Sequence, residues 1–255
     1  MTELELSRPA VVTSRLLSDL ARSAGLSMPG EQVAARLRAL GWLLPLRTRG
    51  AWEFAPGDRA GPLSGGDTFI ELRAELAVRP DLRIAVGYES AAFLRGLASR
   101  QPGRQVIVTA PGTPRLPALR AFRRVELDLP DAAHSQADGL PVQTVTAVLA
   151  AIAIRPDGFA DWPGLAEWHT SAASAINVAD LQTFLAGRGA AAWARAVYLL
   201  KAGGNLTVAE SISANAPAGN GPFYIGPRRP GGHFDAATRI IDTVVARYST
   251  AHQGS

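Results

Sequence analysis

Arginine is the residue of this chain whose abundance and placement could do chemistry. Of the 26 basic residues, 25 are arginines and one is Lys201, and the 255-residue chain carries a formal net charge of +4. A guanidinium group binds phosphates and guanine edges through paired hydrogen bonds. Arginine-rich, lysine-poor usage is also typical of a high-GC coding bias, so the position of an arginine, rather than its abundance, has to indicate a binding role.

Fourteen of the 25 arginines lie in two stretches of the chain. Residues 8–54 contain seven arginines and three acids, which equals the whole formal charge of the chain, and residues 95–124 contain seven arginines and no acid. A basic module beside near-neutral sequence usually meets a polyanion. The alternative for both stretches is a solvated surface whose acids lie elsewhere in the sequence. The second stretch is predicted to form a secondary basic surface from Arg95, Arg100, Arg104, Arg115, Arg120, Arg123 and Arg124.

Most of the known catalytic and metal-binding sequence motifs are absent from the chain. Without cysteine, disulfides, cysteine–zinc sites and cysteine nucleophiles are excluded. The histidines have no i, i+4 pair and no HExxH motif, so each is expected to be a surface or capped residue; they are His134, His169, His233 and His252. A GxSxG elbow and a phosphate loop are also missing. The sequence therefore predicts no enzyme, no metal site and no cofactor.

Two helices and a hairpin are predicted near the N-terminus. The first helix covers residues 14–24 from a cap at Thr13 or Ser14, and the second covers residues 29–40. Two β-prone runs flank a turn at residues 47–50, which is typical of a hairpin. A helix, a turn, a helix and a hairpin with arginines at its tip match the plan of a winged helix-turn-helix. The alternative is a purely structural unit with the same elements.

The predicted DNA contacts follow from this plan. The face of the second helix opposite its apolar side is small and polar, which lets a helix lie close to base edges, where arginine pairs with guanine, glutamine with adenine and alanine with a thymine methyl. The hairpin tip can reach a minor groove or phosphates. The predicted contact residues are Thr13, Ser14, Arg15, Arg22, Gln32, Ala35, Arg36, Arg38, Ala39, Arg47, Thr48 and Arg49.

The remaining chain predicts a second domain of the α+β class. A DNA-binding domain at residues 1–56 and a Gly/Pro-rich linker at 57–66 precede a domain at 67–255, with strands early and helices late. Strands are expected at 83–88, 104–110 and 124–129. Helices are expected from 68 to 78, from 89 to 97, and along several later segments, the last over residues 237–248. Capping boxes are expected at Thr68 with Glu71 and at Thr207 with Glu210.

Membrane insertion is not expected. The longest apolar stretch, residues 145–154, is about half of the ~18 residues that a membrane span needs, and the N-terminus lacks an apolar signal core. We therefore expect a soluble, cytoplasmic protein.

Six segments are informative in combination: VVTSRLLSDLA and LGWLLPLRTRGAWEF near the N-terminus, and ESAAFLRGL, RQVIVTAPG, RPDGFADWPGL and AAWARAVYLLKAGG further along. Together they resemble AbiEi-type antitoxins, the regulatory halves of bacterial AbiE toxin–antitoxin pairs. The resemblance implies an N-terminal winged helix that represses its own operon at promoter repeats, and an AbiEi-like C-terminal domain that supports both repression and neutralisation of a nucleotidyltransferase-like toxin, directly or indirectly. Family members commonly have a full helix before the position of Val11, where only ten residues stand here. This additional helix before Val11 is therefore expected to be absent or replaced by a strand.

The leading hypothesis is a DNA-binding antitoxin that represses its own promoter, with double-stranded DNA and a toxin as partners. The sequence contains no Gly-Ser dipeptide followed by paired aspartates, the pattern of a nucleotidyltransferase, which distinguishes it from such a toxin. The alternative is a protein-interaction module that neutralises a partner by direct binding, with DNA binding incidental. An enzyme with an unrecognised site is a third hypothesis.

Overall fold

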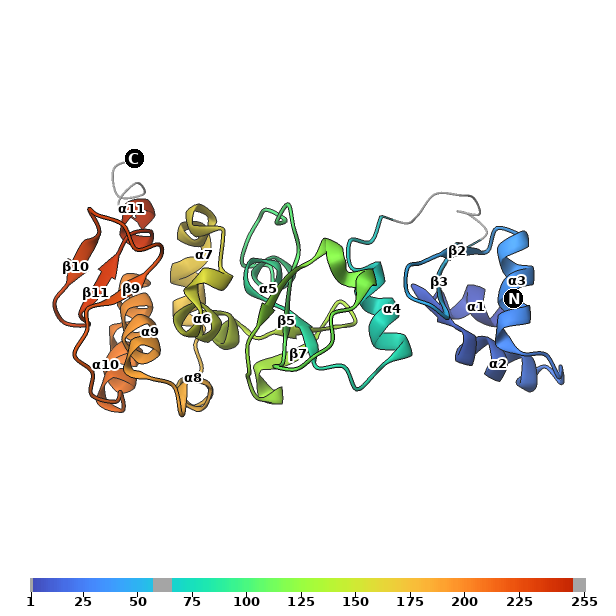
Figure 1. The fold of residues 1–255 in the computed structure, drawn as a ribbon, viewed down its shortest axis with the longest axis horizontal. Coiled ribbons are helices and arrows are strands. Elements are labelled where there is room, and N and C mark those ends of the chain that lie inside the picture. The colour runs from blue at the N-terminus through green and yellow to red at the C-terminus, as the bar shows by residue number, and fades with distance from the viewer. Residues whose placement is uncertain (1, 57–65, 250–255) are drawn as a thin grey trace. The chain divides into compact units, whose positions relative to one another are not determined.

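The computed structural model describes residues 2–56 and 66–249 and divides the chain into two compact units (Figure 1). The first unit contains Met1–Arg83 and Thr113–Ala121, and the second contains Ile84–Gly112 and Phe122–Ser255. Residues 67–83, which the sequence assigned to the second domain, are thus grouped with the first unit by their contacts. The predicted linker lies outside the described residues except for Gly66.

The first unit is a small helical unit with a three-stranded antiparallel sheet of order β1-β3-β2. Its apolar core takes side chains from α1, β1, α2, α3, β2 and β3, and α4 packs on β1 and β3. The elements are α1 (Thr2–Ser7), β1 (Val11–Thr13), α2 (Ser14–Ser23), α3 (Gly30–Ala39), β2 (Leu43–Pro45), β3 (Ala51–Phe54), α4 (Ile70–Val78) and the 3-10 helix η1 (Pro117–Ala121).

Local sequence signals account for the helix and hairpin boundaries in this unit. The Thr13 hydroxyl accepts a hydrogen bond from the Leu16 amide at the start of α2, and Gly25 adopts a left-handed φ of 74° just after its end. The expectation that no helix precedes Val11 is wrong, because the six-residue helix α1 is present before the strand β1. Leu4 of α1 is only 3% exposed, so the short helix is held by its place in the core.

The predicted capping box at the start of α4 is also wrong. Phe69 occupies the cap position without a side-chain hydrogen bond to the helix. The carboxylate of Glu71 instead accepts hydrogen bonds from the turn between β2 and β3. The Glu71 carboxylate, which the capping box would use as a local acceptor, therefore binds residues that are distant in sequence.

The second unit begins with a mixed five-stranded sheet of order β6-β5-β4-β8-β7. The pairs β4/β5 and β7/β8 are antiparallel, whereas β4/β8 and β5/β6 are parallel. Its elements are β4 (Ile84–Val86), α5 (Tyr88–Leu94), β5 (Val106–Thr109), β6 (Arg123–Glu126), the 3-10 helix η2 (Asp131–Ala133), β7 (His134–Ala137) and β8 (Leu140–Gln143). The three strands that the sequence predicted here are confirmed as β4, β5 and β6.

Helices follow this sheet, which confirms the predicted α+β class with strands early and helices late. They are α6 (Val145–Ile154), the 3-10 helix η3 (Pro156–Gly158), α7 (Trp162–Ser174), α8 (Val178–Leu185), α9 (Ala190–Ala202) and α10 (Leu206–Ala214). Residues 146–153 of α6 are all buried, so this helix runs through the core. The predicted Thr207 capping box is wrong, because the Asn205 side chain caps α10 by accepting from the Val208 amide.

The last part of the chain departs most from the predicted helix at residues 237–248. It forms a second small sheet of order β10-β11-β9, from β9 (Phe223–Ile225), β10 (His233–Asp235) and β11 (Ile240–Asp242), before the short helix α11 (Val245–Ser249). The β-branched residues Ile240 and Ile241 of β11 pair with β10 on one side and with β9 on the other. Asp242 then accepts hydrogen bonds from the Val244 and Val245 amides, and so starts α11. No helix within the described ranges has the length and hydrophobicity to cross a membrane.

Candidate functional site

One side of α3 is open to solvent and carries the residues that the sequence predicted for base contacts. Gln32, Ala35, Arg36, Arg38 and Ala39 are all exposed. The same helix buries two apolar side chains against the core, at positions 34 and 37. The helix is thus amphipathic, and its outer face combines small residues with hydrogen-bond donors.

The start of α2 lies next to the hairpin. Thr13 and Ser14 are half-buried, Arg15 is exposed, and the Ser14 amide donates to the Gly50 carbonyl over 3.0 Å. Gly50 has a φ of 77°, a left-handed conformation that glycine adopts without strain. Ser14 therefore joins the first turn of α2 to the hairpin turn. At the other end of α2, the exposed Arg22 pairs with Asp19 at 3.0 Å.

The hairpin turn alternates in exposure. Arg47 and Arg49 are exposed, whereas Thr48 between them is only 2% exposed. The Thr48 hydroxyl faces α4, with its oxygen 3.0 Å from Glu75 Oε1 and 3.3 Å from Glu71 Oε2. Thr48 was a predicted contact residue, and the structure places it inside the unit, while its two neighbours point to solvent.

Five of the seven arginines of the first stretch have no side-chain partner among the described residues, whereas four of the seven in the second stretch donate hydrogen bonds within their own unit. Among the described residues, the guanidinium groups in one set form no hydrogen bond or ion pair; these belong to Arg15, Arg36, Arg38, Arg47 and Arg49. All five are exposed and lie at the start of α2, on α3 and at the hairpin turn. Exposed, unpaired guanidinium groups are available to an external anion without breaking an internal contact.

The seven arginines of the second stretch are not brought together. Arg115 and Arg120 belong to the first unit, and the other five belong to the second. Four of the latter donate hydrogen bonds within their own unit: Arg95 to backbone carbonyls of β8, Arg104 to Phe122, Arg123 to Gly158 and Glu89, and Arg124 to Thr109. Arg100, Arg115 and Arg120 are exposed. The secondary basic surface stays a prediction.

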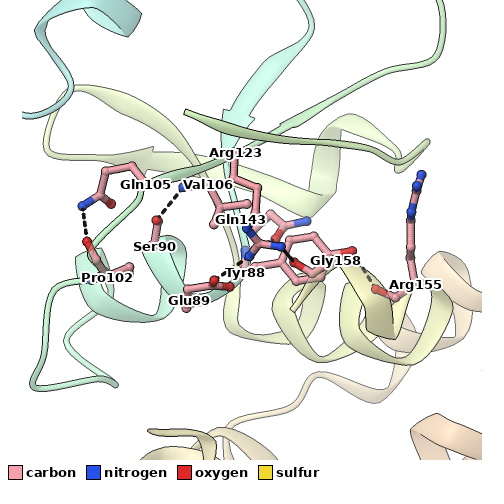
Figure 2. Close-up of polar contacts among 10 residues, drawn as sticks. All are labelled: Tyr88, Glu89, Ser90, Pro102, Gln105, Val106, Arg123, Gln143, Arg155 and Gly158. Carbon is pink, nitrogen blue, oxygen red and sulfur yellow. Dashed lines mark hydrogen bonds and ion pairs between the residues drawn. The ribbon is translucent and has the colours of Figure 1, made fainter. Parts of the chain in front are cut away.

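The second unit contains a buried polar cluster at the start of α5 (Figure 2). The Arg123 guanidinium, from β6, donates to Glu89 Oε1 and to the Gly158 carbonyl. The amide of Tyr88 donates to Gln143 Oε1 over 2.9 Å, and the Tyr88 hydroxyl donates to the Arg155 carbonyl over 3.1 Å. These contacts join the sheet, α5 and the end of α6 into one network.

Burial controls the ionisation of this cluster. Glu89 is 5% exposed, and its desolvation raises the pKa of the carboxyl group, although the charge of Arg123 acts in the opposite direction. Desolvation likewise raises the pKa of the Tyr88 hydroxyl. Tyr88 has a φ of 51°, which is rare for a bulky residue, so the surrounding contacts must hold it there. Sequence reasoning missed the cluster because its members are dispersed along the chain.

The histidines do not gather in the described chain. The expectation of a surface position is wrong for His169, which is 4% exposed in α7. Its burial lowers the pKa of the imidazole, because desolvation disfavours the charged form. Among residues 2–56 and 66–249, no group of three His, Asp or Glu side chains is arranged to hold a metal ion.

Two comparisons with known proteins found matches, one over part of the chain and one over nearly all of it. Residues 84–202 match the family model of the AbiEi antitoxin C-terminal domain. The structure is similar to the crystal structure of the RV2827C protein from Mycobacterium tuberculosis, with a TM-score of 0.82 and 25% sequence identity over 99% of this chain and 92% of that chain. None of the curated proteins compared with the chain matches it.

Proposed function

We propose that this chain is the antitoxin of a bacterial AbiE-type toxin–antitoxin system and that it represses its own promoter by binding DNA. Residues 84–202 match the family model of the AbiEi antitoxin C-terminal domain. The family match supports an antitoxin role in a toxin–antitoxin pair. The first unit supports the second half of the proposal. Its order of elements, α2, α3 and the β2–β3 hairpin, is that of a winged helix-turn-helix.

The observation that carries the DNA proposal is the set of five exposed arginines without internal partners. An arginine used to stabilise a fold has partners inside that fold, as Arg95 and Arg123 do in the second unit. These five arginines, all from residues 8–54, lie on the three elements that a winged helix presents to DNA. Neutralising phosphates releases bound counterions, so such a surface binds DNA with an affinity that falls steeply with salt.

The helices α2 and α3 and the β2–β3 hairpin contact different parts of the DNA in this proposal. Arg15 at the start of α2, and Arg47 and Arg49 at the hairpin turn, are placed for phosphates or a minor groove. Gln32, Arg36 and Arg38 are the long hydrogen-bonding side chains of α3. They read base edges in the major groove, and the small residues beside them allow the helix to approach. Phosphate contacts then supply affinity, and α3 supplies the preference for promoter repeats.

A competition binding experiment tests this proposal. A fragment of the chain's own promoter and an unrelated duplex of the same length are titrated with the wild-type chain and with the Arg36→Ala/Arg38→Ala variant. Loss of base contacts should lower the preference for the promoter by about tenfold or more, since one bidentate base contact contributes roughly 1–3 kcal/mol. The matched control is Arg228→Ala/Arg247→Ala, which removes two exposed arginines from the second unit. Equal binding of both duplexes by the wild-type chain would count against promoter recognition.

The family match also supports a toxin as the second partner, and we take this toxin to be nucleotidyltransferase-like. Coexpression with the reading frame adjacent to the gene tests this part. The chain should restore growth when that reading frame is toxic. Rescue by the Arg36→Ala/Arg38→Ala variant under a foreign promoter would show that neutralisation is separable from repression. A harmless neighbouring gene would contradict the toxin assignment.

A further inference from the structure

The hairpin turn of the first unit is held from two sides. On one side the Ser14 amide of α2 donates to the Gly50 carbonyl over 3.0 Å. On the other side α4 supplies two carboxylates: Glu71 Oε1 accepts from the Arg47 amide over 2.9 Å, and Glu75 Oε1 lies 3.0 Å from the Thr48 hydroxyl. A four-residue turn thus has a tertiary hydrogen bond at three of its positions.

One of the two carboxylates on α4, that of Glu75, is itself fixed by burial and an ion pair. Glu75 is only 3% exposed, and its second oxygen accepts an ion pair from Arg79 over 2.6 Å. Near the start of the same helix, Arg73 pairs with Asp67 over 2.7 Å. Buried, charge-assisted hydrogen bonds are short and directional, so they hold a backbone more firmly than contacts to solvent do.

We propose that Glu71 and Glu75 are positioning residues for the DNA interface, because they hold the turn so that Arg47 and Arg49 face DNA as a fixed pair. The proposal rests on the DNA-binding function inferred above and goes beyond it, because it assigns a role to acidic residues of α4. A turn already ordered in the free protein loses little conformational entropy when its arginines meet phosphates. A turn released from α4 would lose that entropy on binding.

The sign of the effect separates this role from simple electrostatics. Removing an acid next to two arginines should strengthen DNA binding if only charge matters, because it removes repulsion from phosphates. Positioning predicts the opposite for Glu71→Ala, which deletes the acceptor of the Arg47 amide. Glu71→Gln is the matched control, because it removes the same charge and keeps an acceptor oxygen in place.

The experiment measures the affinity of the full chain for the promoter duplex over a range of salt concentrations. Glu71→Ala and Thr48→Val should each weaken binding by about tenfold, since ordering the backbone of a single residue costs roughly 1–2 kcal/mol. The slope of log affinity against log salt should stay at the wild-type value, because no phosphate contact has been removed. Glu71→Gln should bind at least as tightly as wild type, and Thr48→Ser, which keeps the hydroxyl, should restore binding.

Amide hydrogen exchange of residues 47–50 in the absence of DNA provides a readout independent of binding. Exchange should become faster in Glu71→Ala and Thr48→Val while α2 and α3 keep their protection, which also shows that the unit is folded. If Glu71→Ala binds as tightly as wild type or more tightly, the positioning role is overturned although DNA binding stands. If the wild-type chain shows no salt-dependent DNA binding, the proposed function fails, and the inference fails with it.

Discussion

Replacing both Arg47 and Arg49 with glutamine should weaken DNA binding at low salt and should also make the affinity less dependent on salt. Both guanidinium groups are exposed and form no internal contact in the described structure, so the change removes two charges without breaking the fold. The backbone hydrogen bond from position 47 to Glu71 does not depend on the side chain and remains. The variant therefore changes the surface that meets DNA and leaves the turn in place.

The expected magnitude follows from the number of charges. Each phosphate neutralised on duplex DNA contributes about 0.9 to the slope of log affinity against log salt, so losing two contacts should lower the slope by about 1.8. Between ~50 mM and ~200 mM salt, the wild-type chain should then lose about twelvefold more affinity than the variant loses. If the five unpaired arginines of residues 8–54 all bind phosphates, these contacts should contribute about 4.5 to the wild-type slope.

Fluorescence anisotropy with a labelled promoter duplex measures these slopes. The control variant, Arg228→Gln/Arg247→Gln, removes the same number of charges from exposed arginines of the second unit. Its slope should match that of the wild-type chain. An unchanged slope for the Arg47/Arg49 variant, or an equal decrease in the control, would refute the assignment of these two arginines to phosphate contacts.

Three further predictions concern folding and are checked by urea unfolding. Thr13→Ala removes the hydroxyl that caps α2 and should lower the free energy of unfolding by about 1 kcal/mol. Arg123→Ala leaves the buried Glu89 carboxylate without its cation and should cost about 3–5 kcal/mol. The raised pKa of Glu89 means that the folded state binds its proton more tightly than the unfolded state. Its contribution to stability should be present below the unfolded pKa and be lost as pH rises through the folded pKa, so the stability of wild type relative to Glu89→Gln should fall over that range.

Each of these predictions has an outcome that would contradict it. Thr13→Ser should keep most of the wild-type stability, and an equal loss in both Thr13 variants would argue against a capping role. The double variant Arg123→Ala/Glu89→Ala should be more stable than Arg123→Ala alone, because it removes the unpaired charge. A difference between wild type and Glu89→Gln that stays constant with pH would show that this carboxyl group has an ordinary pKa.

Local signals predicted much of the first unit from the sequence. Thr13 as a cap, Gly25 as a stop and the turn at residues 47–50 depend on backbone conformations that a few neighbouring residues determine. The same signals did not distinguish a strand from a helix at Ile240–Asp242. The strand exists because it pairs with Phe223–Ile225 and His233–Asp235, and such pairing is a tertiary interaction that the helical spacing of apolar residues does not report.

Composition could not separate the two arginine-rich stretches. Both have seven arginines, and the second has no acid within its span. Yet Arg123 binds Glu89, 34 residues away, and Gly158, 35 residues away. Whether an arginine is paired inside the protein or available to a partner thus depends on contacts between residues distant in sequence. Local charge counting predicts where arginines are dense, and only the fold shows which ones have partners.

In the hairpin turn, residues 47–49 depend both on local sequence and on contacts with distant residues. Its arginines stand on either side of a buried threonine, so a shift of one residue would turn an arginine toward the carboxylates of α4 and expose Thr48. The hydrogen bond from the Thr48 hydroxyl to Glu75 opposes that shift, because a buried carboxylate that loses a donor is destabilised. The acids of α4 therefore do more than offset nearby positive charge. They determine which residues of the turn point outward, and in this way a buried contact specifies the basic surface.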